Sequence, residues 1–404
     1  MRARLVGVSA IGCAKTKVRS SLKNNIIRRN GILLFSFFLV SCAHTPFPLE
    51  NNPKPAQIEI VQNHGRYLFN GPQGGFFSIG MNSFMEGYDN PRLKKITDSK
   101  NRCLTYEYEL TRLRDLGFNS LGGWTQLDCP MPSRVFMPSV VVLFDDVDTP
   151  HGTRTWNLKE EDGVSPISSI DDPGYREHLT QYLEKKVVEY KNNPVLCYAV
   201  GAEIGLGDSD AIDYPLPIVR DWLAFVTSTL RKLDPGKLIC SPKLSVWDFG
   251  PYLNEPIQKH HFDTFEGMFD LLAVDWYSKQ VTPSQIDWHQ LDEVSIKLGI
   301  PVFVAEFGTR QAIPGWNNTP GAKSIVQTQA ERASRYKTQM EFFFSKPNIV
   351  GVHWFRWQDQ LSSEHQFNKG IVKVEDGTIR PYSELTQEMK LTNQAIKSAV
   401  SESR

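Results

Sequence analysis

Two glutamates that each follow an apolar run are the residues of this chain best suited to chemistry. Glu306 follows the apolar run PVFVA, and Glu203 follows the run VLCYAVGA. Glu203 precedes Glu306 by 103 residues. A carboxylate at the end of a buried strand is costly to desolvate unless it is paired or used. Two carboxyl groups held about 5–5.5 Å apart can cleave a glycosidic bond with retention of configuration, one as nucleophile and one as acid and base. Taken singly, each also has a structural interpretation: a salt bridge for Glu306 and a turn cap for Glu203.

The elements that must position these carboxylates are eight strand-like runs, most of them separated by amphipathic helical runs. Continuous apolar runs of this length are typical of strands buried on both faces. They cover residues 75–82, 118–123, 140–144, 195–201, 237–241, 271–277, 301–307 and 349–355. Their number predicts an α/β fold, a (β/α)8 TIM barrel, preceded by a short N-terminal β-hairpin at 58–72. An open doubly wound sheet is the alternative, but no Gly-x-Gly-x-x-Gly motif follows the first run.

In a barrel the functional groups collect at the carboxyl ends of the strands. A spacing of about three βα units places Glu203 after the fourth strand and Glu306 after the seventh, across the barrel mouth. The other strand ends also carry polar or aromatic residues, namely Asn82, Trp124, Asp275, Tyr277, His353 and Trp354. Acids beside flat rings indicate a sugar site, in which the acids do the chemistry and the rings face the sugar.

Several stretches of the chain resemble one group of enzymes. They are HGRYLFNGPQGGFFSIGMNS, LGFNSLGGWT, NNPVLCYAVGAEIG, PVFVAEFG, GVHWFRWQDQ and NKGIVKVEDGTIRPYSEL, and they are spread over residues 58–395. In them the chain resembles glycoside hydrolase clan A, which carries its acid/base on strand 4 and its nucleophile on strand 7, and within it the β-agarase-type branch. The resemblance implies that Glu203 is the acid/base and Glu306 the nucleophile. It also implies that Tyr277 hydrogen-bonds the nucleophile and that Trp354 forms the floor under the reacting sugar.

One departure from that pattern concerns the residue before the acid/base. The clan usually has Asn there, where it binds the sugar 2-hydroxyl, and this chain has Ala202. That hydrogen bond strengthens in the transition state of such enzymes. Asn82 and Asn119 are the candidate substitutes.

The remaining polar and aromatic candidates each have two interpretations. Trp124 and Trp357 either stack on sugar or pack in the core, and His353 is either a substrate ligand or a satisfied buried imidazole. Asp359, after the last strand, is a candidate for binding hydroxyl groups. Lys243 follows the fifth strand, where it is expected to be solvated rather than to meet an anionic sugar group.

The N-terminus has the pattern of an export signal. Residues 1–30 carry eight Arg and Lys and no acid, and the apolar stretch GILLFSFFLVSC that follows is too short to span a bilayer. Its end, Leu39 to Cys42, resembles a bacterial lipoprotein signal, which implies lipid on Cys42 and a membrane-anchored, exported protein. A plain signal peptide cut slightly later is the alternative. The expected division is a signal segment (1–42), a linker (43–57) and a catalytic barrel (58–400).

The cysteine spacing and the net charge argue against a zinc protein and a nucleic-acid-binding protein. Cys103 and Cys129 lie in polar loop sequence and are candidates for a disulfide, whereas Cys197 and Cys240 lie in apolar strands, where free thiols are expected. No Cys/His spacing is typical of a zinc site. The net charge of zero gives no reason to expect nucleic acid as a partner. No metal or cofactor is expected.

The sequence therefore predicts an exported retaining glycosidase whose partner is a β-linked oligo- or polysaccharide. The second hypothesis is a carbohydrate-binding barrel that has lost turnover, and Ala202 motivates it. A metal-dependent barrel hydrolase is a third class, but Met81-Asn82-Ser83 offers no His-x-His on the first strand. The loops of a barrel set its specificity, so the sugar is left open.

Overall fold

The structure is a computed structural model. It describes residues 57–86, 90–98, 100–127, 129, 131–132, 135–144, 170–201, 216–246, 265–277, 285–316, 325–361 and 366–402. Cys42, Ala202 and Glu203 lie outside these residues. Within the described residues, none of the helices has the length and apolar character needed to cross a membrane.

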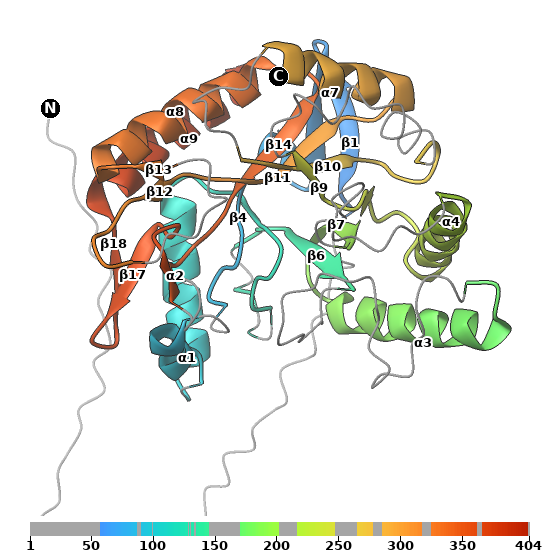
Figure 1. Ribbon diagram of the computed structural model, residues 1–404, viewed down its shortest axis with the longest axis horizontal. Helices are drawn as coiled ribbons and strands as arrows, with labels where there is room; N and C mark the ends of the chain where they lie inside the picture. Colours follow the sequence, from blue (N-terminus) through green and yellow to red (C-terminus); the bar gives the residue numbers. More distant parts are fainter. Residues whose placement is uncertain are drawn as a thin grey trace, which may run out of the picture. The chain divides into compact units, whose positions relative to one another are not determined.

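A parallel sheet curls into a nearly closed barrel at the centre of the fold (Figure 1). Its strands follow one another in the order β8-β7-β6-β5-β4-β14-β11-β10-β9. The two outermost, β8 and β9, are consecutive pieces of one stretch of chain, and Cys240 in that stretch bridges both Ala199 of β7 and Leu271 before β10. The sheet thus has eight strand positions, and its two ends meet. The strands are β4 (Ser78–Met81), β5 (Ser120–Leu121), β6 (Ser139–Leu143), β7 (Val195–Val200), β8 (Ile239–Cys240), β9 (Leu244–Val246), β10 (Leu272–Trp276), β11 (Val302–Phe307) and β14 (Ile349–Trp354).

Helices alternate with most of these strands, which confirms the predicted α/β barrel. They are α1 (Pro91–Thr97), α2 (Arg102–Asp115), α3 (Pro173–Tyr190), α4 (Leu216–Leu233), α7 (Gln285–Leu298), α8 (Gln329–Ser345) and α9 (Ser383–Glu402). Local sequence sets where they begin. Thr328 and Glu331 form a capping box at the start of α8, and Asp172 accepts two backbone hydrogen bonds at the start of α3. Helices α8 and α9 lie side by side (Figure 1).

Side chains of each strand alternate between the barrel interior and the helix layer. In β11, Phe303 and Ala305 belong to the inner apolar cluster, whereas Val302 and Val304 belong to the outer one. Both sets are buried, which is why the strands appear in the sequence as continuous apolar runs.

The predicted N-terminal hairpin is part of a three-stranded antiparallel sheet. Strands β1 (Glu59–Asn63) and β2 (Arg66–Gly71) pair as expected, and β3 (Gly74–Phe76) adds a third strand. The expected first barrel strand at 75–82 is therefore divided between this sheet and β4. Phe69 of β2 packs edge-on against Phe303, near the amino end of β11, so this sheet covers the barrel end opposite the expected site.

Two disulfides cross-link the described part of the chain. Cys103 and Cys129 pair, which settles the option that the sequence left open. Cys197 and Cys240 also pair, so the expectation of free thiols is wrong. The two residues lie on neighbouring strands with Cα atoms 5.9 Å apart, within the range that a disulfide spans. Their apolar surroundings predicted burial but carried no information on which strands are adjacent.

Candidate active site

A cluster of charged and hydroxyl groups lies at the carboxyl ends of β9, β10 and β11. Lys243 contacts the Oε1 of Glu306 through its Nζ, and the same Nζ lies 3.4 Å from the Oδ2 of Asp275. The Tyr277 hydroxyl donates to the other oxygen of Glu306, with 2.6 Å between Oη and Oε2. All three charged residues are almost fully buried, with exposed fractions of 2% for Lys243, 0% for Asp275 and 4% for Glu306. The ammonium thus neutralises part of the charge of two buried carboxylates.

A β-bulge in β11 explains why Glu306 faces this cluster. Strict alternation from Phe303 and Ala305 would turn Glu306 outward, toward the helices. The register between β10 and β11 shifts, so that Val274 pairs with Val304 and Asp275 with Glu306, and Ala305 becomes the extra residue. A bulge re-aims the next side chain, and bulges are common beside active sites. Glu306 consequently lies opposite Asp275 at the barrel mouth.

Tyr277 is a hydrogen-bond donor to Glu306 rather than an anion. Burial, and then the charge of Glu306 beside it, raise the pKa of Tyr277 well above its ordinary value. The phenol therefore keeps its proton at neutral pH, where it can donate to the carboxylate. The donor fixes the orientation of the carboxylate.

Aromatic rings form the walls beside the carboxylate. The Lys243 Nζ lies 3.7 Å from the ring centroid of Trp124, which is close enough for a cation–π contact. The ring of Phe355 meets Trp124 edge-on, with 5.8 Å between centroids. Both rings are half-buried, so part of each side chain is accessible to a bound molecule.

Trp354 lies elsewhere than the sequence led us to expect. Its side chain has an exposed fraction of 0% and packs against Phe307 and against Tyr336 of α8. It therefore belongs to the layer between barrel and helices. Successive side chains of a strand point to opposite faces, so the next residue, Phe355, lies beside Trp124 at the barrel mouth, whereas Trp354, the expected floor under the sugar, does not.

This placement predicts different outcomes for two aromatic truncations. Trp354→Ala leaves a large cavity in the core and is expected to lower the free energy of unfolding by about 3–5 kcal/mol. Phe355→Ala is expected to leave the free energy of unfolding nearly unchanged and to raise KM for a glycan about fivefold, because a contact surface is lost. Urea unfolding and steady-state kinetics on both proteins measure the two effects. A stable Trp354→Ala protein with a raised KM would instead place Trp354 under the substrate.

Three other expected site residues are structural in this fold. His353 lies inside the barrel, where its Nε2 is 2.9 Å from Ser78 Oγ and 3.2 Å from Ser120 Oγ, and burial lowers its pKa to about 3. Asn82 donates to the carbonyls of Ala305 and Trp354 and so ties strands together. Trp357 packs edge-on against Phe84 in the core. These placements favour the structural interpretation of each residue.

Asn119 and Asp359 also serve the backbone. Asn119 bonds the backbone of Ile79 and Phe77 and joins β4 to β5. Asp359 accepts hydrogen bonds from Asn368, Tyr382 and the backbone of Gly370, and burial raises its pKa to about 6. Asn82 and Asn119, the two candidate substitutes for the missing Asn, thus both hydrogen-bond the backbone.

Lys243 is the main residue that sequence reasoning misjudged. It was expected in solvent, and the structure buries it between two carboxylates. A signal was present, because Lys243 follows the fifth strand just as Asp275 and Glu306 stand at the sixth and seventh. Strand ends that meet at one mouth bring their charges together. Among the described residues, no group of three or more His, Cys, Asp or Glu is arranged to hold a metal ion.

Comparisons with known proteins agree with this fold. No family model matches the chain. The β-agarase B of Vibrio sp. (strain JT0107) is 23% identical over 180 residues, which make up 43% of this chain and 17% of that protein. The chain therefore spans under a fifth of that relative's length.

Solved structures align over most of the chain. The crystal structure of BpGH50 superposes with a TM-score of 0.65 at 17% identity and covers 86% of this chain and 83% of that one. An exo-β-agarase superposes with a TM-score of 0.63 at 14% identity, covering 85% of this chain and 65% of that one. A β-D-glucuronidase for Dictyoglomus thermophilum gives 0.53 at 14% identity, covering 84% and 53%. At these identities the likeness shows a shared fold: the chain is an α/β barrel of the kind found in glycoside hydrolases.

Proposed function

We propose that the protein is an exported retaining glycoside hydrolase that cleaves β-linked glycans by double displacement with two glutamates. The observation that carries the proposal is the buried Glu306 carboxylate, oriented by Lys243 and Tyr277 beside the half-buried rings of Trp124 and Phe355. Relatives of the same fold are named as agarases and other glycosidases, which favours a β-linked glycan and agarose-like galactans first.

In the first step of the proposed reaction, a Glu306 oxygen attacks the anomeric carbon while the glycosidic C–O bond breaks. Glu203 gives its proton to the departing oxygen. In the second step a water oxygen attacks the same carbon, Glu203 takes the water's proton, and the bond to Glu306 breaks. Glu203 follows β7, whose carboxyl end opens at the same mouth of the parallel barrel as that of β11.

The neighbours of Glu306 fit the role of a nucleophile. Lys243 pairs with one carboxylate oxygen and Tyr277 donates to the other, so both oxygens are held in place. Orientation of this kind brings a nucleophile within reach of the anomeric carbon.

A substrate screen tests the proposal. The mature protein is incubated with 4-nitrophenyl β-glycosides and with agarose, other galactans and β-glucans, beside a Glu306→Gln preparation made in the same way. Sugar release by the wild type alone is expected. Tight binding without release by either protein would favour the carbohydrate-binding barrel that Ala202 motivates, and neither binding nor release would reject both functions.

We also propose export with lipid on Cys42. The motivation is the sequence from Leu39 to Cys42 behind an apolar stretch too short to span a bilayer. The two disulfides support an oxidising compartment. Expression in a bacterial host is expected to place the full-length protein in the membrane fraction, and Cys42→Ser is expected to release it. Mass spectrometry that finds an unmodified mature N-terminus beyond residue 42 would contradict the anchor.

A further inference from the structure

Two cationic side chains lie at the edge of the Glu306 cluster. Arg310, in β12 (Arg310–Gln311), follows Glu306 by four residues, and its guanidinium carbon lies 4.0 Å from the ring centroid of Phe367. Lys369 Nζ lies 4.6 Å from the centroid of Phe355, 5.2 Å from that of Phe367 and 5.9 Å from that of Tyr277. Phe355 and Tyr277 border Glu306, so both cations are at the edge of the same site.

Arg310 is incompletely satisfied within the protein. Its Nη1 is buried and has no hydrogen-bond partner among the described residues, although the residue as a whole is half-buried. Arg332, in contrast, is fully buried and donates to carbonyls of Thr309, Lys369 and Gly370 and to side chains of Gln329 and Asn368. Leaving a buried donor unpaired is costly, and an anion on the guanidinium fork offsets that cost.

The charge of Arg310 reaches the active site and persists at neutral pH. Burial lowers the pKa of Arg310 to about 10, which still leaves the group protonated. The same charge opposes the rise in the pKa of Tyr277 that burial causes. Lys243 differs, because Asp275 and Glu306 already neutralise it.

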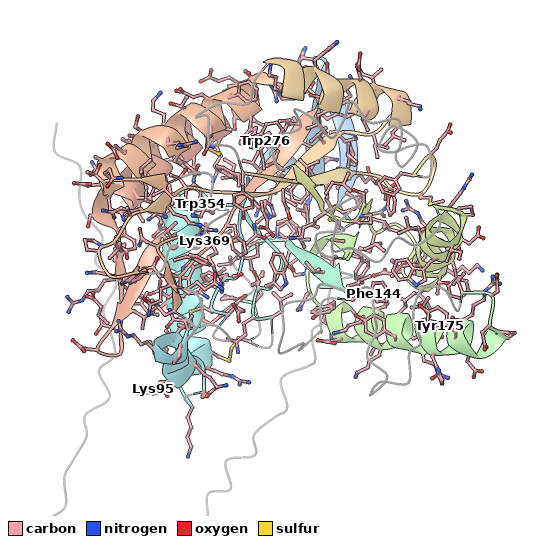
Figure 2. The ribbon with its side chains drawn as sticks, in the orientation of Figure 1. Lys95, Phe144, Tyr175, Trp276, Trp354 and Lys369 are labelled. Atoms are coloured by element: carbon pink, nitrogen blue, oxygen red, sulfur yellow. A yellow bond between two sulfur atoms is a disulfide. The ribbon has the colours of Figure 1, made fainter. Side chains whose placement is uncertain are left out.

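The segment that carries Lys369 is held rigidly. Arg332 donates to the Lys369 carbonyl, and so does Trp354 Nε1 at 3.3 Å; Figure 2 shows Trp354 and Lys369 next to each other. The neighbouring Asn368 donates to Asp359, which also accepts from Gly370 N. The backbone of Lys369 is therefore fixed before any ligand arrives, so its ammonium is confined to this side of the site.

We propose that Arg310 and Lys369 bind an anionic substituent, a sulfate ester or a carboxylate, on the sugar chain that occupies the Glu306 site. The proposal rests on the proposed function, because it places a glycan beside Glu306. The guanidinium gives a planar fork of donors, and the ammonium gives a point charge. Phe355 and Phe367 supply apolar surface under the ring that carries the substituent.

Binding is tested in the full mature protein with Glu306→Gln, so that substrate is not consumed. Calorimetry compares a neutral β-linked galactan tetrasaccharide, the same tetrasaccharide bearing a sulfate ester, and a β-linked tetrasaccharide bearing a uronate. At least one anionic ligand is expected to bind about tenfold more tightly than the neutral one. The anionic ligand that binds more tightly than the neutral one identifies the preferred anion as sulfate or carboxylate. Raising NaCl is expected to weaken that binding and to leave the neutral ligand unaffected.

Variants that remove a positive charge test which residues cause the preference for the anionic ligand. In the same background, Arg310→Gln and Lys369→Gln are each expected to reduce the preference for the anionic ligand about tenfold, whereas Lys369→Arg retains it. Arg380→Gln, which removes an exposed cation on β18 (Thr378–Pro381), is the matched control and is expected to retain the preference. The salt dependence is measured without these substitutions and does not depend on whether the variants fold.

The outcomes separate this inference from the proposed function. Two results overturn the anion site alone. In the first, the neutral ligand binds as tightly as both anionic ligands. In the second, Arg310→Gln and Lys369→Gln leave the preference for the anionic ligand unchanged. Hydrolysis of the neutral tetrasaccharide by the wild type with no anionic preference keeps the glycosidase and rejects the inference. Anionic preference in binding without hydrolysis by the wild type keeps the anion site and rejects the glycosidase. Absence of binding by all three ligands overturns both.

Discussion

Glu306→Ala is expected to reduce kcat/KM on a glycan by about 10⁴-fold or more, the order seen when a covalent nucleophile is removed. Added azide is then expected to attack the anomeric carbon from the vacated face and to give a product of inverted configuration. Proton NMR of the glycosyl azide measures that configuration directly. The stereochemistry tests the role of Glu306, whereas a lower rate alone would also follow from misfolding.

Glu203→Ala is the matched variant for the other glutamate. It is expected to keep activity on substrates with good leaving groups, because these leave without a proton. Azide rescue there is expected to give retained configuration, because the glycosyl-enzyme on Glu306 still forms. The two variants are thus expected to give glycosyl azides of opposite anomeric configuration.

Two results would contradict the assignment. A wild-type enzyme that releases inverted product has no covalent intermediate and needs a wider gap between the carboxyl groups. A Glu306→Ala protein with normal activity would leave Glu306 as one partner of a buried ion pair with Lys243. Both measurements are made on folded protein, which circular dichroism checks.

The barrel was predictable from the sequence because its strands are buried on both faces. Burial on both faces gives continuous apolar runs, and the eight predicted runs correspond to the eight strand positions of the sheet. The division of residues 75–82 between β3 and β4 was not visible, because both pieces are apolar and extended. The point at which such a segment changes its partner strand cannot be seen in its sequence.

The placement of Trp354 depends on a register shift that the sequence does not show. Val350 belongs to the inner apolar cluster, but the pairing with β11 shifts between Ile349 and Gly351, after which His353 faces inward and Trp354 faces the helices. Glu306 shows the same effect. Alternation alone turns it outward, and only the bulge at Ala305, which depends on pairing with β10, directs it to the site.

The contacts of Lys243 and Cys197 depend on which strands are neighbours. A single lysine after a strand is usually solvated, and a cysteine in an apolar strand is usually a free thiol. Both expectations failed because a closed barrel brings together residues far apart in the sequence, Lys243 with Glu306 and Cys197 with Cys240. Residue type and local pattern do not encode such pairs.

The second large effect is expected for Lys243→Met, which leaves Asp275 and Glu306 as two buried carboxylates without their shared cation. Removing one partner of a buried ion pair destabilises a protein by about 3–5 kcal/mol, because the remaining charge is buried and uncompensated. The variant is therefore expected to unfold at much lower urea concentration. Lys373→Met is the matched control: Lys373 pairs with Glu375 at 3.1 Å on the surface, where a pair contributes about 0–1 kcal/mol.

Lys243→Met also separates a catalytic contribution from a structural one. Without the ammonium, the Oε1 of Glu306 loses its partner and only the Tyr277 hydroxyl orients the carboxylate, so kcat of the folded fraction is expected to fall about tenfold or more. Lys243→Arg keeps the charge and is expected to restore most of the free energy of unfolding, even where the longer, planar group lowers kcat. A kcat unchanged in Lys243→Met, measured on the folded fraction, would mean that Lys243 stabilises the barrel without orienting Glu306.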